Sequence, residues 1–347
     1  MEIQNNKRYE SLDILRGLCA FSILVYHYTG WVFGRYDASH VIGRFGVYGV
    51  SMFYVLSGLT MYLVYFRKFS FDLPFVKEFF TKRLFRIYPL MLFVVLVSFL
   101  FFGTENDWKE QLLVSTGTFS VLKWDASSPT GMWSIGNELS FYLMLPFIFL
   151  ALKKGKVWAW LISLLIFGLY LYFGLHVLNS PLESVSETRD YKNPLNQAGL
   201  FLGGILIGHL FKEMVIDKKY IWSLLIFSAA LFCFYPTKGE LRNVYIGMDR
   251  IIFTLICFAF TLAFFKVDIS FLPTWSRSPF VWMGEISYSL YLLHPLIFNI
   301  FTTTSLKIRY ILPIAVILSF LISWAVFKII ENPLRNLGYR LLTKKEK

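Results

Sequence analysis

Apolar residues along this chain gather in ten long runs that short polar connections separate. A helix needs roughly 20 mostly apolar residues to cross the hydrocarbon core of a bilayer, and most of the runs approach that length. The sixth run is short, which leaves open a tilted, broken or partly inserted helix. The pattern predicts an all-α, polytopic transmembrane bundle of about ten helices, near residues 12–33, 45–66, 84–103, 133–152, 157–177, 198–212, 219–235, 248–266, 279–302 and 309–330.

The basic residues between the runs predict an orientation. With both termini cytoplasmic, the cytoplasmic segments hold about two thirds of the 34 lysine and arginine residues, as the positive-inside rule requires. An odd number of helices would place the basic C-terminal end on the opposite side, so ten helices are favoured over nine or eleven. We interpret residues 1–347 as a single membrane domain and residues 336–347 as a short basic cytoplasmic tail near anionic lipid headgroups.

The composition agrees with a chain whose main solvent is lipid. Hydrophobic residues make up 56% of the sequence and charged residues 16%, which is too apolar for a soluble surface. The net charge of +12 follows from the positive-inside distribution, so the partner it indicates is the bilayer and not nucleic acid. Cys19, Cys233 and Cys257 lie within apolar runs, without the spacing of a disulfide framework or a metal site. The first run lacks a small-residue cleavage site, which indicates an uncleaved helix.

Two ionisable residues lie within the first run, where burial in lipid is costly. Such a group costs about 2.5–3.5 kcal/mol on insertion scales. Arg16 and His27 are eleven residues apart, which returns to within about 20° of the same helix face and separates them by about 16 Å along the axis. A snorkelling arginine and a hydrogen-bonded histidine would explain each residue alone. The shared face favours one continuous pathway, with Arg16 near the cytoplasm and His27 in the outer half.

A carboxylate enters the fourth run from the outer side. In the segment WSIGNE, Glu138 lies about two turns of helix below the outer surface, close to the expected depth of His27. A carboxylate beside an imidazole can orient it, set its tautomer and stabilise the imidazolium, which turns a histidine into a general base. We therefore predict that Glu138 orients His27, with a purely structural hydrogen-bonded pair as the alternative.

Two arginines begin the third run. Arg83 and Arg86 are spaced i, i+3 in KRLFRIYPL, so their guanidinium groups face the same way and suit a polyphosphate or another anionic headgroup. The positive-inside rule alone also places arginines at such an end. Because Arg16 is expected at a similar depth, we favour an anion site.

The ninth run carries a polar stripe. Ser287, Tyr291 and His294 are spaced i, i+4 and i+7, and Pro295 leaves the carbonyl of Tyr291 without its usual helical donor. Packing through hydroxyl groups explains the serine and the tyrosine about as well as function does. His294 is harder to explain by packing, and we expect it in the outer half near His27.

The polar groups therefore form two expected layers, a donor site on the cytoplasmic side and a reaction site on the outer side. Walker, GxSxG and HExxH motifs are absent from the sequence, so nucleotide hydrolysis and a bound metal are poorly supported. The main alternative is a transporter or flippase for a lipid-linked glycan, with Arg16, His27 and Glu138 lining a polar pathway. The two halves of the chain show no self-similarity of the kind many transporters have, which weakens that alternative.

Five motifs in this order resemble the acyltransferase-3 family of integral membrane O-acyltransferases. The motifs are LDILRGLCAFSILVYH, GVSMFYVLSGL at 49–59, KRLFRIYP at 82–89, WSIGNELSFY at 133–142 and ISYSLYLLHP at 286–295. The resemblance implies transfer of an acyl group, mostly acetyl, from acetyl-CoA as co-substrate to an extracytoplasmic or lipid-linked glycan. It also implies a multi-pass protein of a cell membrane, most simply a bacterial inner or plasma membrane.

By that resemblance, Arg16 and His27 match the family's essential pair. Arg83 and Arg86 match its paired arginines and Glu138 its glutamate, so that the arginines would bind acyl-CoA and His27 would act as general base or transient acyl carrier. Many members have an aspartate where this chain has Ser51, and some carry an SGNH-type domain for which this chain has no residues. The acceptor, the acyl chain and the oligomeric state stay open. The remaining residues expected to support the site are Ser51, Trp133, Ser134, Tyr142, Ser287, Tyr291 and His294.

Overall fold

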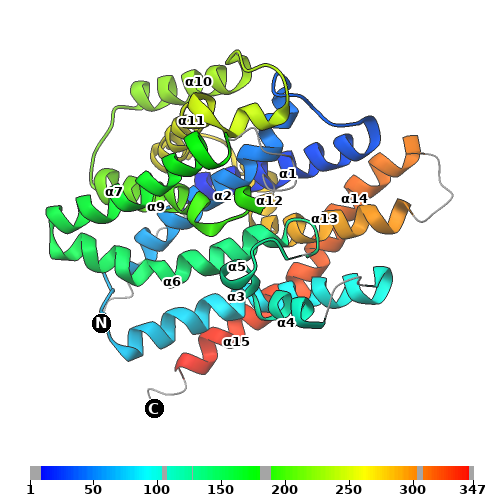
Figure 1. Ribbon diagram of the computed structural model, residues 1–347, viewed down its shortest axis with the longest axis horizontal. Helices are drawn as coiled ribbons and strands as arrows, with labels where there is room; N and C mark the ends of the chain where they lie inside the picture. The colour runs from blue at the N-terminus through cyan, green and yellow to red at the C-terminus, as the bar shows by residue number, and fades with distance from the viewer. Residues whose placement is uncertain (1–8, 104–107, 127, 180–188, 303–307, 344–347) are drawn as a thin grey trace.

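The computed structural model describes residues 9–103, 108–126, 128–179, 189–302 and 308–343, and within them it contains helices and no strands. Figure 1 shows these helices side by side in one bundle, with α10 and α11 along one flank and α3 and α15 along the opposite one. The helices are α1 (Glu10–Phe33), α2 (Val41–Tyr65), α3 (Leu73–Phe102), α4 (Trp108–Thr116), α5 (Phe119–Leu122), α6 (Met132–Lys154), α7 (Lys156–Tyr172), η1 (Phe173–Val177), α9 (Pro194–Phe211), α10 (Lys218–Phe234), η2 (Leu241–Tyr245), α11 (Gly247–Lys266), α12 (Thr274–Glu285), α13 (Ser287–Thr302), α14 (Ile308–Val326), η3 (Phe327–Glu331) and α15 (Asn332–Thr343).

The predicted class, an all-α polytopic membrane protein, is confirmed. Seven helical segments of the described chain are long and apolar enough to cross a membrane. The other three predicted runs are also helical, as α1, α10 and the pair α12 and α13. The seven segments are Val41–Tyr65, Leu73–Phe102, Met132–Lys154, Lys156–Val177, Arg189–Phe211, Gly247–Lys266 and Ile311–Leu342.

Helix α3 begins eleven residues before the third apolar run, at Leu73. The side chain of Asp72 accepts a hydrogen bond from the backbone N–H of Phe75 at 2.8 Å, and Pro74 occupies the first turn. A capping carboxylate and an early proline are both typical of a helix start. The first turns of α3, which mix apolar and charged residues, therefore extend the apolar span and carry Arg83 and Arg86 on a continuous helix.

The ninth predicted helix is broken at Ile286 into α12 and α13. Helix α12 approaches α1 so closely that a Cβ atom at Gly284 would lie 2.0 Å from the carbonyl oxygen of Asp13. On α1, a Cβ atom at Gly17 would lie 2.8 Å from the backbone nitrogen of Gly284. Gly17 and Gly284 thus permit contact between the backbones of α1 and α12, and this contact is next to Arg16 in the sequence.

Helices α2 and α9 cross at a second pair of glycines. A Cβ atom at Gly58 would lie 2.0 Å from the carbonyl oxygen of Phe201, and one at Gly204 would lie 1.9 Å from that of Val55. Both helices are largely buried, so this crossing lies inside the bundle. The sixth predicted helix is therefore a continuous, buried helix and not a broken one.

Most of the segment predicted as a basic tail, residues 336–347, forms a helix. A π-helical turn, Phe327–Glu331, follows α14 and leads directly into α15. Helix α15 packs on α3, where a Cβ atom at Gly338 would lie 2.6 Å from the Cβ of Phe85. Residues 332–343 are part of the bundle, and residues 344–347 lie outside the described chain.

Basic connections meet at one end of the bundle. Lys153, at the end of α6, donates a hydrogen bond of 2.5 Å to the carbonyl of Phe69 in the connection between α2 and α3. Lys266, at the end of α11, donates to the carbonyls of Lys212 and Met214, which follow α9, at 3.0 and 2.8 Å. The connection between α2 and α3 therefore contacts the end of α6, and the segment after α9 contacts the end of α11.

Candidate active site

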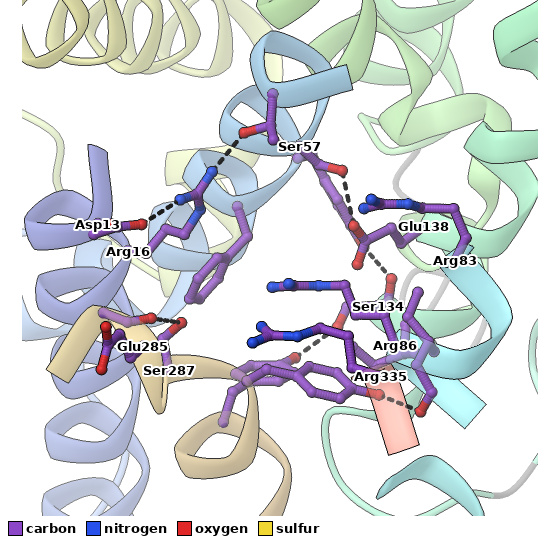
Figure 2. A pocket seen from close by; sticks show the side chains of 18 of the residues that line it. Asp13, Arg16, Ser57, Arg83, Arg86, Ser134, Glu138, Glu285, Ser287 and Arg335 are labelled. Atoms are coloured by element: carbon purple, nitrogen blue, oxygen red, sulfur yellow. Dashed lines mark hydrogen bonds and ion pairs between the residues drawn. The ribbon is translucent and has the colours of Figure 1, made fainter. Parts of the chain in front are cut away.

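A cavity of about 530 Å³ opens inside the bundle among α1, α2, α3, α6, α12, α13 and the segment from η3 into α15 (Figure 2). Its lining is unusually charged for the interior of a membrane protein. Positive side chains outnumber carboxylates, which favours an anionic occupant. The positive group comprises Arg16, Arg83, Arg86, Lys328 and Arg335, and the carboxylates are Asp13, Glu138 and Glu285.

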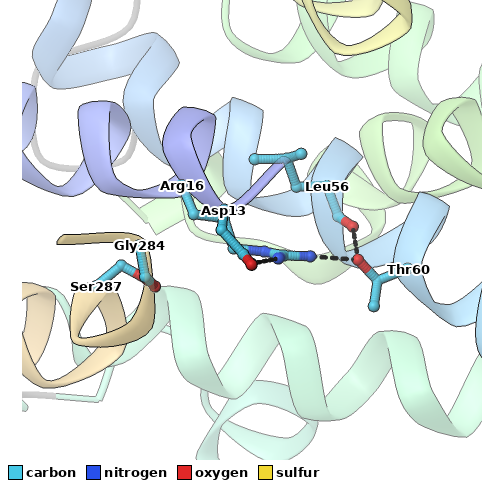
Figure 3. Close-up of polar contacts among 6 residues, drawn as sticks. All are labelled: Asp13, Arg16, Leu56, Thr60, Gly284 and Ser287. Carbon is cyan, nitrogen blue, oxygen red and sulfur yellow. Dashed lines mark hydrogen bonds and ion pairs between the residues drawn. The ribbon is translucent and has the colours of Figure 1, made fainter. Parts of the chain in front are cut away.

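Arg16 is held on the wall of the cavity by neighbours on α1 and α2 (Figure 3). Its Nη1 donates to the carboxylate of Asp13 at 2.7 Å, and its Nη2 donates to the hydroxyl of Thr60 at 2.5 Å. Thr60 in turn donates to the carbonyl of Leu56 at 2.7 Å. One carboxylate and one hydroxyl therefore fix the guanidinium in place, and the close contact of α1 with α12 fixes the helix that carries it.

Arg83 is the most deeply buried cation of the cavity, with 9% of its surface exposed. Its Nη2 donates to the hydroxyl of Tyr65 at 2.9 Å, and its guanidinium lies over the rings of Tyr65 and Tyr142 at 5.3 and 6.0 Å. The buried Nε atom has no hydrogen-bond partner among the described residues. A buried donor without a partner is costly, and no described group offsets that cost at this atom. Arg86 lines the same cavity, as the sequence predicted.

Glu138 belongs to this cavity and not to the histidine layer. Its Oε1 accepts a hydrogen bond from Ser57 at 2.8 Å and another from Tyr142. Figure 2 shows its side chain beside that of Arg83. The structure therefore does not bring Glu138 into hydrogen-bond contact with His27, which bonds His294 instead, and the first turns of α6 pack against α5. A Cβ atom at Gly136 would lie 2.6 Å from the ring of Phe119 in α5.

The structure adds charged residues that the sequence analysis counted only toward topology. Lys328 and Arg335 line the cavity from η3 and α15. Arg335 donates a hydrogen bond of 2.6 Å to the side chain of Asn332. Glu331 is 1% exposed and accepts a hydrogen bond of 2.7 Å from Ser289. Lys328 lies at the end of the tenth apolar run, Glu331 and Arg335 follow it, and a π-helical turn, which often marks a functional site, was not visible from periodicity.

His27 lies outside the cavity and pairs with the second expected histidine. Its Nδ1 lies 2.8 Å from the Nε2 of His294, and the Nδ1 of His294 lies 3.0 Å from the carbonyl oxygen of Leu290. The hydroxyl of Tyr28 donates to the carbonyl of His294 at 2.8 Å. The ring of Trp31 stacks on His27, with ring centroids 5.0 Å apart and planes at 5°. The predicted neighbourhood of His27 and His294 is thus present.

Tyr291 and Phe53 separate the cavity from the histidine pair. Both residues line the cavity, and their rings lie in edge-to-face contact at 5.9 Å. The hydroxyl of Tyr291 lies 2.8 Å from that of Ser134 and donates to the carbonyl of Gly131 at 3.1 Å. On the other side, the ring of Tyr291 is 6.1 Å from that of His294. The polar stripe of α13 therefore runs from the cavity, at Ser287, to the histidines.

Two residues expected to support the site lie elsewhere. Ser51 lines a separate small cavity of about 10 Å³ together with Tyr48, Gln197 and Arg250. Trp133 packs against Tyr191, with ring centroids 5.6 Å apart. The expectation that Ser51 and Trp133 are part of one site with Arg16 is therefore not met by the geometry.

The sequence matches a known protein family. The sequence profile of the acyltransferase-3 family, described as an acyltransferase domain, matches residues 9–328. The chain belongs to the acyltransferase-3 family. The match includes the cationic cavity up to Lys328 and both histidines, and it confirms the resemblance that the five motifs indicated.

Curated relatives of this acyltransferase-3 protein include O-acetyltransferase OatA of Staphylococcus aureus, which is 26% identical over 98% of this chain and 59% of its own length. Peptidoglycan O-acetyltransferase OatA of Listeria monocytogenes is 24% identical over 96% of this chain and 57% of its own length. The chain thus spans somewhat less than three fifths of the length of these relatives. No solved structure matches it significantly.

Proposed function

We propose that this protein is a membrane O-acyltransferase that moves an acetyl group from acetyl-CoA, bound in the cationic cavity, to a hydroxyl group of an extracytoplasmic or lipid-linked glycan. Family membership and the names of the relatives support acyl transfer, and one relative acts on peptidoglycan by name. The acceptor is accordingly a cell-envelope glycan, and the protein acts in the bacterial cell membrane with its basic end toward the cytoplasm.

The observation that carries the proposal is the cluster of arginine and lysine side chains around one cavity, with the deeply buried Arg83 among them. A buried guanidinium without a complete set of partners is stabilised when an anion enters, and phosphate accepts paired hydrogen bonds from arginine. The phosphates of coenzyme A supply such charge. Arg16, Arg86, Lys328 and Arg335 surround the same space, so phosphates at different positions along the donor would each meet a cation.

The chemistry takes place at His27, beyond Phe53 and Tyr291. In one route, the acceptor oxygen attacks the thioester carbon, the carbon–sulfur bond breaks, and the imidazole carries the hydroxyl proton to the departing sulfur. In the other, the imidazole attacks the thioester and releases the thiol. The acyl-histidine then passes the acyl group to the acceptor oxygen, and the hydroxyl proton remains on the imidazole. In both routes the pantetheine arm must pass the Phe53–Tyr291 contact.

A binding and transfer assay on purified protein in nanodiscs tests this function. Labelled acetyl-CoA is expected to bind, and Arg83→Ala is expected to weaken binding by about tenfold or more, because a charged hydrogen bond contributes about 1.5–3 kcal/mol. The matched control is Arg277→Ala, which removes an arginine that lies outside the cavity lining and pairs with Glu10.

The same preparation separates transfer from transport. Acyl transfer or thioester hydrolysis that depends on His27 supports the enzyme, whereas movement of a lipid-linked glycan without any turnover of acetyl-CoA would support a flippase. Failure of the wild-type protein to bind acetyl-CoA would contradict the proposed donor. Trapping labelled acyl-histidine without acceptor distinguishes the two chemical routes.

A further inference from the structure

We propose that His294 fixes the tautomer of His27, so that the Nε2 atom of His27 is the one that carries the free electron pair for the reaction. This inference rests on the proposed function, because it assigns the reacting atom of the same site. It gives to a second histidine the orienting role that the sequence analysis expected of Glu138.

The direction of each hydrogen bond follows from a carbonyl group at one end of the chain of contacts. The backbone carbonyl of Leu290 can only accept, so the Nδ1 of His294, at 3.0 Å, must donate to it. In a neutral imidazole the other nitrogen then holds an electron pair, so the Nε2 of His294 accepts. The Nδ1 of His27, at 2.8 Å, must therefore carry a hydrogen and donate. This leaves the Nε2 of His27 unprotonated.

The surroundings favour the neutral form of this pair. His294 is fully buried, and its ring contacts are aromatic: His27, Tyr28, Trp31 and Tyr291. Among the residues that the structure describes, no carboxylate forms a hydrogen bond or an ion pair with either histidine. A buried imidazolium without a counter-charge is costly, so the resting pair is neutral.

Both rings are held in the geometry that this bonding requires. Helix α13 is anchored beside His294 by Tyr28, whose hydroxyl donates to the carbonyl of His294 and lies 2.6 Å from the hydroxyl of Ser319. The ring of His27 is fixed by the stacked ring of Trp31 and by its bond to His294. His27 is also partly exposed, and Trp31 is 40% exposed, so a partner can approach from this side. The free Nε2 is thus presented by a rigid support.

The hydrogen bond between the two histidines also stabilises His27 after it has taken the proton of the acceptor hydroxyl. When the Nε2 of His27 takes the acceptor's proton, the resulting imidazolium still donates through Nδ1 to the neutral Nε2 of His294, and this bond becomes stronger because its donor is charged. His294 holds the ring and stabilises that charge without touching the substrate. It is therefore a positioning residue, and His27 is the catalytic one.

Three variants test the role of the accepting atom. His294→Leu removes the acceptor and is expected to lower kcat by about 100-fold, since a general base contributes 10²–10⁴-fold, while the KM for acetyl-CoA stays unchanged. His294→Gln offers an amide oxygen to the Nδ1 of His27 and is expected to recover much of kcat. His176→Leu removes a histidine near the end of α7 and serves as the control. Equal kcat in His294→Leu and wild type, or equal losses in the Leu and Gln variants, would overturn the proposal.

A spectroscopic measurement tests the tautomer without any activity. In protein with nitrogen-15 in its histidine side chains, the signals of His27 are assigned by their loss in His27→Gln. We expect a protonated Nδ1 and an unprotonated Nε2 in wild type, and a shift toward the Nε2–H form in His294→Leu. An Nε2–H form in wild type would overturn the inference. If the tautomer is as expected but the protein transfers no acyl group, the proposed function has failed and the inferred hydrogen bonding has not.

Discussion

The hydroxyl of Tyr291 lies 2.8 Å from the hydroxyl of Ser134, and this contact joins α13 to α6 at the boundary between the cationic cavity and the histidine pair. Tyr291 also donates to the carbonyl of Gly131, the residue before α6, whose φ of +84° favours glycine. The ring of Tyr291 therefore has polar anchors on one helix and an apolar contact with Phe53 on another. It is positioned to exclude water from the path to His27.

Replacing the ring of Tyr291 is expected to increase hydrolysis of acetyl-CoA relative to acetyl transfer to the acceptor. Tyr291→Ala removes the barrier and admits water, so acetyl-CoA hydrolysis should rise relative to acceptor acetylation by about tenfold, an estimate based on the role of water exclusion in such sites. Tyr291→Phe keeps the ring and should change this ratio far less. The measurement is the ratio of free acetate to acetylated acceptor. An unchanged ratio in Tyr291→Ala would show that water is excluded elsewhere.

Glu138 should affect donor binding and not the histidine. Glu138→Ala leaves the hydroxyls of Ser57 and Tyr142 without their acceptor and loosens the ring that lies beside Arg83. We expect the Kd of acetyl-CoA to rise by about tenfold, the equivalent of 1.4 kcal/mol. Glu138→Gln retains an oxygen acceptor and should bind nearly as wild type. Normal binding with abolished transfer in both variants would instead place Glu138 in the chemical step.

Arg335 is expected to strengthen donor binding through its charge. Arg335→Ala should raise the KM for acetyl-CoA by about 3–10-fold with kcat nearly unchanged. The reason is that Arg335 lines the cavity, whereas the two histidines do not. Arg335→Lys should recover only part of the loss, since a lysine lacks the planar pair of donors. Arg277→Ala is again the control. A fall in kcat at unchanged KM would contradict a donor-binding role.

Much of the helix bundle could be predicted because a lipid solvent demands long apolar runs. The break at Ile286 was not predicted: the polar residues of GEISYSL interrupt the apolar run there, and the break lies beside the contact of Gly284 with the backbone of α1, which the sequence does not show. The start of α3 was also missed, since Lys77, Glu78, Lys82 and Arg83 interrupt the apolar residues of its first turns and the continuous apolar run begins later. Asp72, which caps the first turn of α3, was the local residue that could have predicted this helix start.

Within the site, the arginines were predictable and the depth of Glu138 was not. Arg16, Arg83 and Arg86 line one cavity, as their expected similar depth predicted, although Arg83 and Arg86 lie well inside α3 and not at its start. Glu138 was placed by counting turns from the outer surface, but α6 begins inside the bundle at Met132, beside Tyr291 and beneath Phe119. Periodicity gives the face of a helix and not the depth at which it starts.

The small cavity near Ser51 gives a prediction about stability. Arg250 is 4% exposed, its Nη2 donates to Asn196 at 2.6 and 2.8 Å, and its guanidinium lies 3.9 Å above the ring of Tyr170. Its Nη1 has no hydrogen-bond partner in the described chain, and Ser51 lines the same space of about 10 Å³. The family resemblance implies an aspartate in many members at the position of Ser51, and an aspartate there would place a carboxylate beside this charge.

Ser51→Asp is therefore expected to stabilise the protein, because it supplies a partner to a buried cation that is already present. A hydrogen bond to a charged group contributes about 1.5–3 kcal/mol, and the cost of burying Arg250 is the same in both proteins. The midpoint of thermal unfolding in nanodiscs should rise, while Ser51→Ala should leave it nearly unchanged. Acetyl transfer should persist in Ser51→Asp because the residue lies outside the cationic cavity. A lower midpoint in Ser51→Asp than in Ser51→Ala would show that the carboxylate does not reach Arg250.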